Sequence, residues 1–334
     1  MPSAVETFDI RKNFGELAAV KGISIQINEG EFFGFLGPNG AGKSTLIRML
    51  TTVLKPTSGT AKVGGYDIIK EPEEVRRSIG VVTQNMASDL DLTARENMDI
   101  FGKFYEVPKK IRQERIDELL ERVGLTKKAD ELAATFSGGM RRRLDIARVL
   151  VHRPAMLFLD EPTSGLDPQS RRVVWDMLQG FMKDYNMTVF LTTHYMDEAE
   201  SLCTRVAIID YGSIITMGTP DELKAGIPGN DIVIMTLSGD AEKVRGLAEA
   251  EGYVHKVQLE DNDLRCYVDS GSENAPRLMK LATEAGVKVK AVSIKNLSLE
   301  DVFIHYTGRS IREEESKKVS LFLGAGVPSK LGRG

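Results

Sequence analysis

The stretch GPNGAGKST, residues 37–45, decides the fold that the rest of the sequence has to fit. It follows EFFGFL, an apolar run typical of a buried strand, and opens KSTLIRMLTTVL, in which apolar residues recur at helical spacing. Glycines between a strand and a helix let the backbone wrap a phosphate chain, and the free amides at the helix start attract the anion. The pattern G-x-x-x-x-G-K-[ST] in this context therefore predicts a nucleotide-phosphate site.

Two side chains of this loop carry specific chemistry. Lys43 is placed to reach the β- and γ-phosphates of a nucleotide, and Ser44 is placed to bind Mg²⁺. The other contacts are expected from the loop as a whole. Its residues are Gly37, Pro38, Asn39, Gly40, Ala41, Gly42, Lys43, Ser44 and Thr45.

Acidic and imidazole side chains follow two later apolar runs. Asp160 and Glu161 end MLFLDE (156–161), where two carboxylates would be costly without a cation to serve. We expect Asp160 to hold Mg²⁺ and Glu161 to act as the base or orienter of the attacking water. His194 follows TVFLTT (188–193), a strand whose carboxyl end should lie beside that of the Asp160 strand, where parallel sheets bind ligands.

The order of the elements predicts an α/β core followed by a smaller domain. Strands alternate with helices in the first part, a hairpin is expected around Tyr211-Gly212, and a helical block over about 88–153 is too long for a simple crossover. We interpret that block as an inserted helical subdomain of a nucleotide-binding domain over 1–225. Residues 229–308 show the order β-α-β-β-α-β of a ferredoxin-like α+β domain, and 309–334 are expected to be a mobile tail.

The bulk composition excludes several classes of protein. The 334 residues carry a net charge of −4, which provides no positive field for nucleic acid. No run reaches the about 18 apolar residues that span a bilayer, and the N-terminus lacks the layout of a secretory signal. The two cysteines share no metal-ligand spacing, so we expect reduced structural thiols in the cytosol.

One further stretch, TFSGGMRRRLDIARVLV (135–151), brings a family resemblance. Its FSGGM (136–140) stands between the phosphate loop and the acidic strand end, in the order found in ATP-binding cassette (ABC) ATPases, with methionine in place of the usual glutamine. TTHYMDEAESLC (192–203) and NLSLEDVFIHYTG (296–308) resemble the daunorubicin-resistance type of drug-export subunit. The resemblance implies a P-loop NTPase cassette with a mixed sheet core and the inserted helical subdomain.

The resemblance also implies roles for residues outside the phosphate loop. Phe14 matches the aromatic that stacks on adenine, and Gln84 matches the glutamine that touches Mg²⁺ and water and couples to the membrane partner. Ser137, Gly138 and Gly139 match the signature that binds the γ-phosphate held by the opposite subunit. Asp167 matches the residue that contacts the other subunit's phosphate loop, and His194 matches the histidine that senses the γ-phosphate. The implied catalytic set is Glu161, His194, Lys43 and Gln84, and the implied Mg²⁺ ligands are Ser44, Gln84 and Asp160.

The function implied by the resemblance is that of an ATP-hydrolysing subunit. Two copies would close head to tail around two Mg-ATP and power separate integral-membrane permease subunits, from the inner face of the cell membrane and with export as the expected direction. A soluble cassette acting on ribosomes or DNA is the rival class, but the chain holds neither two cassettes nor a long coiled coil. A GTPase would need an N-K-x-D motif, which the sequence lacks. The C-terminal domain could be a spacer, a dimerising module or a ligand sensor, and its fold does not decide among them.

Three consecutive arginines, Arg141, Arg142 and Arg143, follow the signature. We expect them to be solvated and to pair with carboxylates on the surface of the helical subdomain. A role in tuning the phosphate field or in an interface is the alternative. Nucleic-acid contact is disfavoured, because no aromatic residues for base stacking interleave with them.

Overall fold

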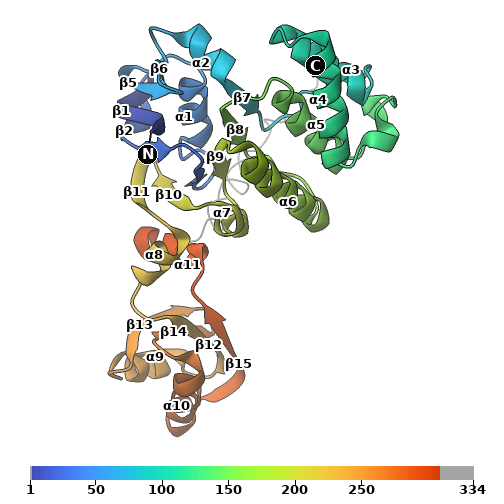
Figure 1. Cartoon of the computed structure of the whole chain (residues 1–334). Coiled ribbons are helices and arrows are strands. Elements are labelled where there is room, and N and C mark those ends of the chain that lie inside the picture. Colours follow the sequence, from blue (N-terminus) through green and yellow to red (C-terminus); the bar gives the residue numbers. More distant parts are fainter. Residues whose placement is uncertain (1, 309–334) are drawn as a thin grey trace, which may run out of the picture. The chain divides into compact units, whose positions relative to one another are not determined.

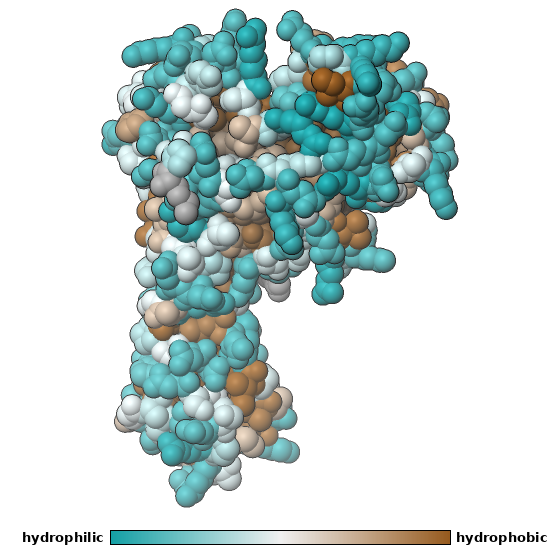
Figure 2. All heavy atoms as spheres, viewed as in Figure 1, coloured by the Kyte–Doolittle hydropathy of each residue, from teal (hydrophilic) through white to brown (hydrophobic). Residues whose placement is uncertain are grey.

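We describe the protein from a computed structural model, which describes residues 2–308. The segment 309–334, for which the sequence analysis expects a mobile tail, lies outside the described residues. The chain divides into two compact units between Met217 and Gly218. Figure 2 shows that the visible face of each unit is mostly hydrophilic, with small apolar patches between the polar side chains.

The first unit is built on a six-stranded sheet in the order β11-β10-β4-β9-β8-β7. Its strands are β4 (Phe32–Leu36), β7 (Ile79–Val82), β8 (Met156–Asp160), β9 (Thr188–Thr193), β10 (Arg205–Asp210) and β11 (Ser213–Gly218). The pairs β10·β4, β4·β9, β9·β8 and β8·β7 are parallel. Every residue of β4, β8 and β9 is buried, as expected for strands covered on both faces. The strands predicted from the apolar runs, and the hairpin at Tyr211-Gly212, are confirmed.

A second, antiparallel sheet lies in the same unit and was not part of the sequence prediction. It orders its strands β2-β1-β5-β6, with β3 paired to β1. They are β1 (Ser3–Phe14), β2 (Leu17–Ile23), β3 (Gln26–Asn28), β5 (Ser58–Val63) and β6 (Tyr66–Asp67). Helix α1 (Lys43–Leu50) buries Leu46 and Leu50 in one apolar cluster with Val5 of this sheet and Phe35 of the other. The phosphate loop is thus held between two sheets.

The helices of the first unit fall into a core group and an insert (Figure 1). The core group is α1, α2 (Pro72–Ser78), α6 (Pro168–Tyr185) and α7 (Met196–Leu202). The insert between β7 and β8 holds α3 (Ala94–Phe104), α4 (Lys109–Arg122), α5 (Gly138–Leu150) and the short 3₁₀ turns η1 (Thr126–Lys128) and η2 (Ala133–Thr135). Helices α3, α4 and α5 pack on one another, which gives the expected helical subdomain.

The second unit has the predicted order β-α-β-β-α-β (Figure 1). It consists of β12 (Asp231–Ser238), α9 (Ala241–Glu249), β13 (Val254–Glu260), β14 (Asp263–Val268), α10 (Gly271–Glu284) and β15 (Lys288–Asn296). The sheet is antiparallel in the order β13-β14-β12-β15, and both helices pack on one face of it. Helix α8 (Pro220–Ala225) packs against α11 (Leu299–Thr307) within this compact unit. Among residues 2–308, no helix combines the length and apolar character needed to cross a membrane.

Candidate functional site

The phosphate loop, residues 37–45, joins β4 to α1. Gly40 and Gly42 have φ angles of +86° and +107°, in the left-handed region that favours glycine. A Cβ on Gly42 would lie 2.4 Å from the carbonyl oxygen of Ala19. The loop therefore keeps its tight curve only with glycine at position 42, and α1 begins at the next residue, Lys43, with its first amides free of helical partners.

Lys43 is buried inside the curve of this loop. Its Nζ donates to the carbonyl oxygens of Gly37 at 2.7 Å and Pro38 at 3.1 Å. The same ammonium lies 3.1 Å from Oε1 of Glu161, in an ion pair with both side chains almost fully buried. The structure thus places Lys43 where the sequence predicts it, with Glu161 as its counter-charge.

Glu161 and His194 meet because β8 and β9 are neighbours in the sheet. His194 Nδ1 lies 3.0 Å from Oε2 of Glu161. Burial by itself would raise the pKa of the Glu161 carboxyl, but the hydrogen bond from His194 and the charge of Lys43 outweigh it and hold this pKa below its usual value. Glu161 also has a φ of +47°, a conformation that non-glycine residues adopt mainly at turns and functional sites. The predicted adjacency of the Asp160 and His194 strand ends is confirmed.

Asp160 lies beside Ser44, as a shared metal site requires. Ser44 Oγ donates to Oδ1 of Asp160 at 3.0 Å, and Thr192 Oγ1 donates to the same oxygen at 2.6 Å. Hydroxyl and carboxylate oxygens are the ligands that Mg²⁺ prefers. Thr192 was not predicted from the sequence, although a threonine within the apolar run of a strand that ends at the site could have pointed to it.

One cavity of about 470 Å³ brings together residues from five segments of the first unit. Phe14 lies on its rim, half-exposed, at the end of β1, and Gln84 enters from the loop after β7. The lining residues are Phe14, Leu17, Ala19, Asn39, Gly40, Gly42, Lys43, Ser44, Thr45, Gln84 and Glu161. The cavity thus joins an aromatic ring, a phosphate loop and a buried carboxylate.

The signature residues lie elsewhere. Ser137 caps α5, where its side chain accepts from the amide of Met140 at 3.3 Å. Ser137 and Gly139 line a separate cavity of about 200 Å³ that also contains Ser170. Asp167 caps α6 and accepts from the amide and the hydroxyl of Ser170, bonds that hold its pKa below the usual value. Within one chain, therefore, the structure does not bring the signature and the phosphate loop into one cavity.

The expectation that the three arginines are solvated and pair with carboxylates is wrong for Arg142 and Arg143. Arg142 is 1% exposed, and it donates to the carbonyl oxygens of Thr83 and Gln84. Arg143 donates to the carbonyl oxygen of Val123. Arg142 binds backbone because it is buried between α5 and the loop after β7, whereas Arg143 is only partly buried.

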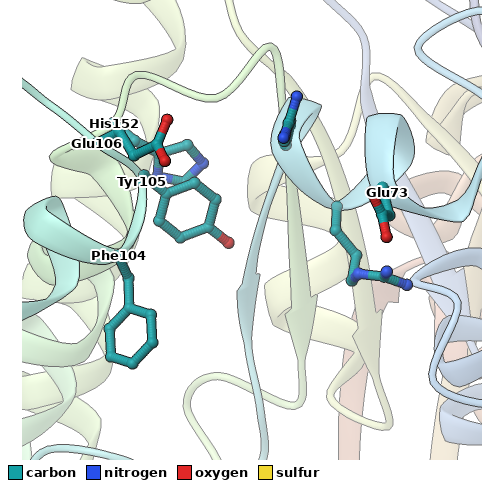
Figure 3. A pocket seen from close by; sticks show the side chains of 7 residues that line it. Glu73, Phe104, Tyr105, Glu106 and His152 are labelled. Carbon is teal, nitrogen blue, oxygen red and sulfur yellow. The ribbon is translucent and has the colours of Figure 1, made fainter.

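A groove that the sequence analysis did not find lies between α2 and the ends of α3 and α5. It has a volume of about 540 Å³ and is lined by Glu73, Arg76, Arg77, Phe104, Tyr105, Glu106 and His152. Figure 3 shows His152, Tyr105 and Phe104 on one wall and Glu73 on the other. The rings of His152 and Tyr105 stack at 3.8 Å, and His152 Nε2 lies 3.0 Å from the carbonyl oxygen of Ile79. Burial lowers the pKa of His152 to about 4.

Comparison with sequence families identifies two matching segments. A family described as ABC transporter matches residues 20–164. A family described as "ATP-binding protein DrrA1-3-like, C-terminal domain" matches residues 218–307.

Relatives resemble the chain over nearly its whole length. It is 38% identical over 307 residues to the linearmycin resistance ATP-binding protein of Bacillus subtilis, which covers 91% of this chain and 98% of that protein. It is 39% identical over 320 residues to the daunorubicin/doxorubicin resistance ATP-binding protein of Streptomyces peucetius, covering 95% and 96%.

Solved structures resemble about two thirds of the chain. CbiO1 of Clostridium perfringens, part of the ABC transporter complex cbiONQ, is 31% identical with a TM-score of 0.63, covering 67% of this chain and 92% of that one. The ATP-binding cassette MJ0796, solved as a dimer in a post-hydrolysis state with ADP and Pi, is 28% identical with a TM-score of 0.58, covering 64% and 98%.

Proposed function

The chain belongs to the ATP-binding proteins of the ABC transporter family, and we propose that two copies pair head to tail around two Mg-ATP to drive a separate membrane permease. Its membership makes it an ATPase with a P-loop cassette fold. We take residues 1–225 as the cassette and 229–308 as an accessory domain.

One observation carries the proposed chemistry: Lys43, Glu161 and His194 converge at the carboxyl ends of three adjacent parallel strands. Lys43 would bind the β- and γ-phosphates once nucleotide oxygens replace the loop carbonyls that it now contacts. Glu161, a carboxylate whose pKa is held below its usual value, would accept a hydrogen bond from the attacking water and orient it. His194 would hold that carboxylate and face the γ-phosphate, and Phe14 would stack on the adenine.

The residues next to Lys43 fit a magnesium ion. Ser44 and Asp160 present oxygens 3.0 Å apart, and Gln84 lines the same cavity. Bound Mg²⁺ would supply neutralisation of the charge on the phosphate oxygens. Thr192 would keep Asp160 in place, since its hydroxyl donates to the carboxylate oxygen that faces Ser44.

The separation of the signature from the phosphate loop supports pairing of two chains. Ser137 and Gly139 stand at the amino end of α5, where free amides and the helix dipole favour an anion, yet they line a cavity distinct from that of Lys43. A second copy in head-to-tail orientation would supply a phosphate loop to this cavity. Asp167, fixed beside the same cavity by Ser170, would then contact the partner's loop.

The groove of Figure 3 is the surface that we propose for the permease. Phe104 is 83% exposed on one wall, while Glu73, Arg76 and Arg77 present charges of both signs on the other. An amphipathic segment of a membrane protein would find an apolar contact and ion-pair partners here. Since α2 runs directly into β7 and then to Gln84, the groove lies one strand away from the nucleotide cavity.

The names of the relatives support export as the direction of transport. Both sequence relatives are described as resistance proteins, one for linearmycin and one for daunorubicin and doxorubicin. We therefore propose an exporter subunit that acts from the inner face of the cell membrane, where the permease would hold it. The cargo would be chosen by the permease.

The test is the molar mass of the full-length Glu161→Gln variant in light scattering, with ATP and with ADP. Glutamine keeps the side-chain shape but removes the carboxylate, so ATP should bind and remain unhydrolysed. We expect the mass to rise from 36.9 kDa to twice that value with ATP and to stay low with ADP. A mass that stays at 36.9 kDa while ATP is bound would contradict the pairing of two chains.

A further inference from the structure

The loop that carries Gln84 is held by a guanidinium from the signature helix. Arg142 Nη1 donates to the carbonyl oxygen of Thr83 at 2.8 Å, and its Nη2 donates to that of Gln84 at 2.6 Å. A guanidinium presents its donors in a rigid plane, so two consecutive carbonyls bound to one fork fix the direction of the peptide between them. The backbone of Gln84 is therefore oriented by α5.

Two more side chains on the same face of α5 hold the following residues. Asp145 accepts from the amide of Ala87 at 3.2 Å and from the hydroxyl of Ser88. Arg148 Nη1 donates to the carbonyl oxygen of Ala87 at 2.8 Å. Positions 142, 145 and 148 recur every three residues and so project from one face of the helix.

Helix α3 completes the attachment. Asn97 accepts from the amide of Asp89 at 2.8 Å and donates to its carbonyl oxygen at 2.9 Å. The segment 83–89 is thus bonded at both ends to the helical insert, although it begins at the end of a strand of the central sheet.

The burial of Arg142 shows how tightly the attachment is made. The side chain is 1% exposed, and burying a guanidinium is costly unless acceptors compensate for the lost water. Here the two loop carbonyls compensate Nη1 and Nη2, while the buried Nε has no hydrogen-bond partner within the described residues. Moving the loop away from α5 would leave a buried charge and two carbonyls without partners, so loop and helix are expected to move together.

We propose that Arg142 is a positioning residue that makes Gln84 travel with the signature helix. Ser137 and Gly139 stand at the amino end of α5, and Arg142 projects from its second turn, so one rigid body carries both the signature and the loop of Gln84. When the signature engages nucleotide on a partner chain, the same displacement moves Gln84, which lines the nucleotide cavity of its own chain. This inference rests on the proposed roles of Gln84 and of the signature.

The first test is hydrogen–deuterium exchange of the full-length chain in peptides covering 83–89. Arg142→Ala should raise exchange in this loop about tenfold or more, as expected for the loss of charge-assisted hydrogen bonds. Arg115→Ala is the matched control, because Arg115 also donates from the helical insert to a backbone carbonyl, that of Val151 at 2.9 Å, but does not contact the loop. Should Arg142→Ala fail to fold, Arg142→Lys keeps the charge while a single ammonium replaces the two-pronged donor.

The second test measures ATP turnover in a double-mutant cycle. Arg142→Ala should lower kcat about tenfold and leave KM within about twofold, since Arg142 does not line the nucleotide cavity. The double variant Arg142→Ala/Gln84→Ala should be no slower than Gln84→Ala alone, because both changes remove one function. The inference would be overturned if the two effects on kcat multiplied in the double variant. It would also be overturned if Arg142→Ala left hydrogen–deuterium exchange in residues 83–89 unchanged. If Gln84→Ala hydrolyses ATP as fast as the parent, the proposed role of Gln84 is refuted. The proposed coupling through Arg142 is then refuted as well, because it depends on that role.

Discussion

The buried position of His152 should make the cassette less stable as the pH falls below about 6.5. Its ring stacks on Tyr105 inside the groove, and burial lowers its pKa from 6.5 to about 4, against the opposing hydrogen bond to Ile79. A histidine with a lowered pKa is neutral in the fold, whereas the unfolded chain binds a proton below about pH 6.5. Its contribution is therefore fully present above pH 6.5 and is lost progressively as the pH falls towards 4.

The size of the effect follows from the shift. One pKa unit corresponds to about 1.4 kcal/mol, so the full shift is worth about 3 kcal/mol. Most of it is lost by pH 5, where the linkage relation gives about 2 kcal/mol of lost unfolding free energy for this single group. Replacing His152 by glutamine removes the titration while offering an amide donor to the Ile79 carbonyl.

The assay is urea unfolding at pH 7.5 and pH 5.0, followed by tryptophan fluorescence. The chain has a single tryptophan, Trp175 in α6, so the signal reports on the first unit alone. From pH 7.5 to pH 5.0 the free energy of unfolding should fall by about 2 kcal/mol more in the parent than in His152→Gln. The other titrating groups contribute equally to both proteins. With only four histidines in the chain, proton NMR can also follow the ring directly. Equal pH slopes, or a His152 resonance that titrates near 6.5, would refute the reasoning.

Two further predictions concern groups next to the site. Glu198 is fully buried, accepts from Thr163 and Trp175 through Oε1, and has its pKa raised by burial. Since a raised carboxyl pKa costs stability as the pH rises above 4.5, Glu198→Gln should lose less stability than the parent between pH 5 and pH 8 in circular dichroism melts. Equal losses would show that the carboxyl is ionised in the fold. Ser137→Arg, made in the Glu161→Gln chain, should leave ATP binding intact and abolish the ATP-dependent doubling of mass, because it fills the signature cavity. The Ser137→Thr variant keeps the helix cap, so its molar mass should still double with ATP. If Ser137→Arg also forms the ATP-dependent dimer, the signature has no role in pairing.

Part of the site was predictable because it depends on short patterns and one rule of sheet geometry. The glycines of the phosphate loop are adjacent in sequence, and their spacing identifies them without any tertiary information. Asp160, Glu161 and His194 end apolar runs typical of buried parallel strands, and the carboxyl ends of such strands meet at one edge. The observed pairing of β8 with β9 and of β9 with β4 confirms that rule for this chain.

Other features escaped prediction because they depend on which surfaces face each other. The antiparallel sheet is built on β1, whose register shifts interrupt the alternation that a strand prediction needs. Thr192 resembles any threonine in an apolar strand until the sheet places its hydroxyl against Asp160. The stacking of His152 on Tyr105 joins the ends of two helices that are far apart in the sequence.

The sequence by itself determined the chemistry of this protein, since the phosphate loop, the acidic strand end and the histidine are each encoded locally by residue type and spacing. The tertiary structure alone decided how that chemistry is positioned. Arg142 illustrates the difference: three arginines in a row read as a solvated surface, yet packing of α5 buries one of them against the loop of Gln84. The physical reason is that a buried charge takes its partners from whatever backbone the fold brings within reach, and short-range sequence patterns carry no record of that proximity.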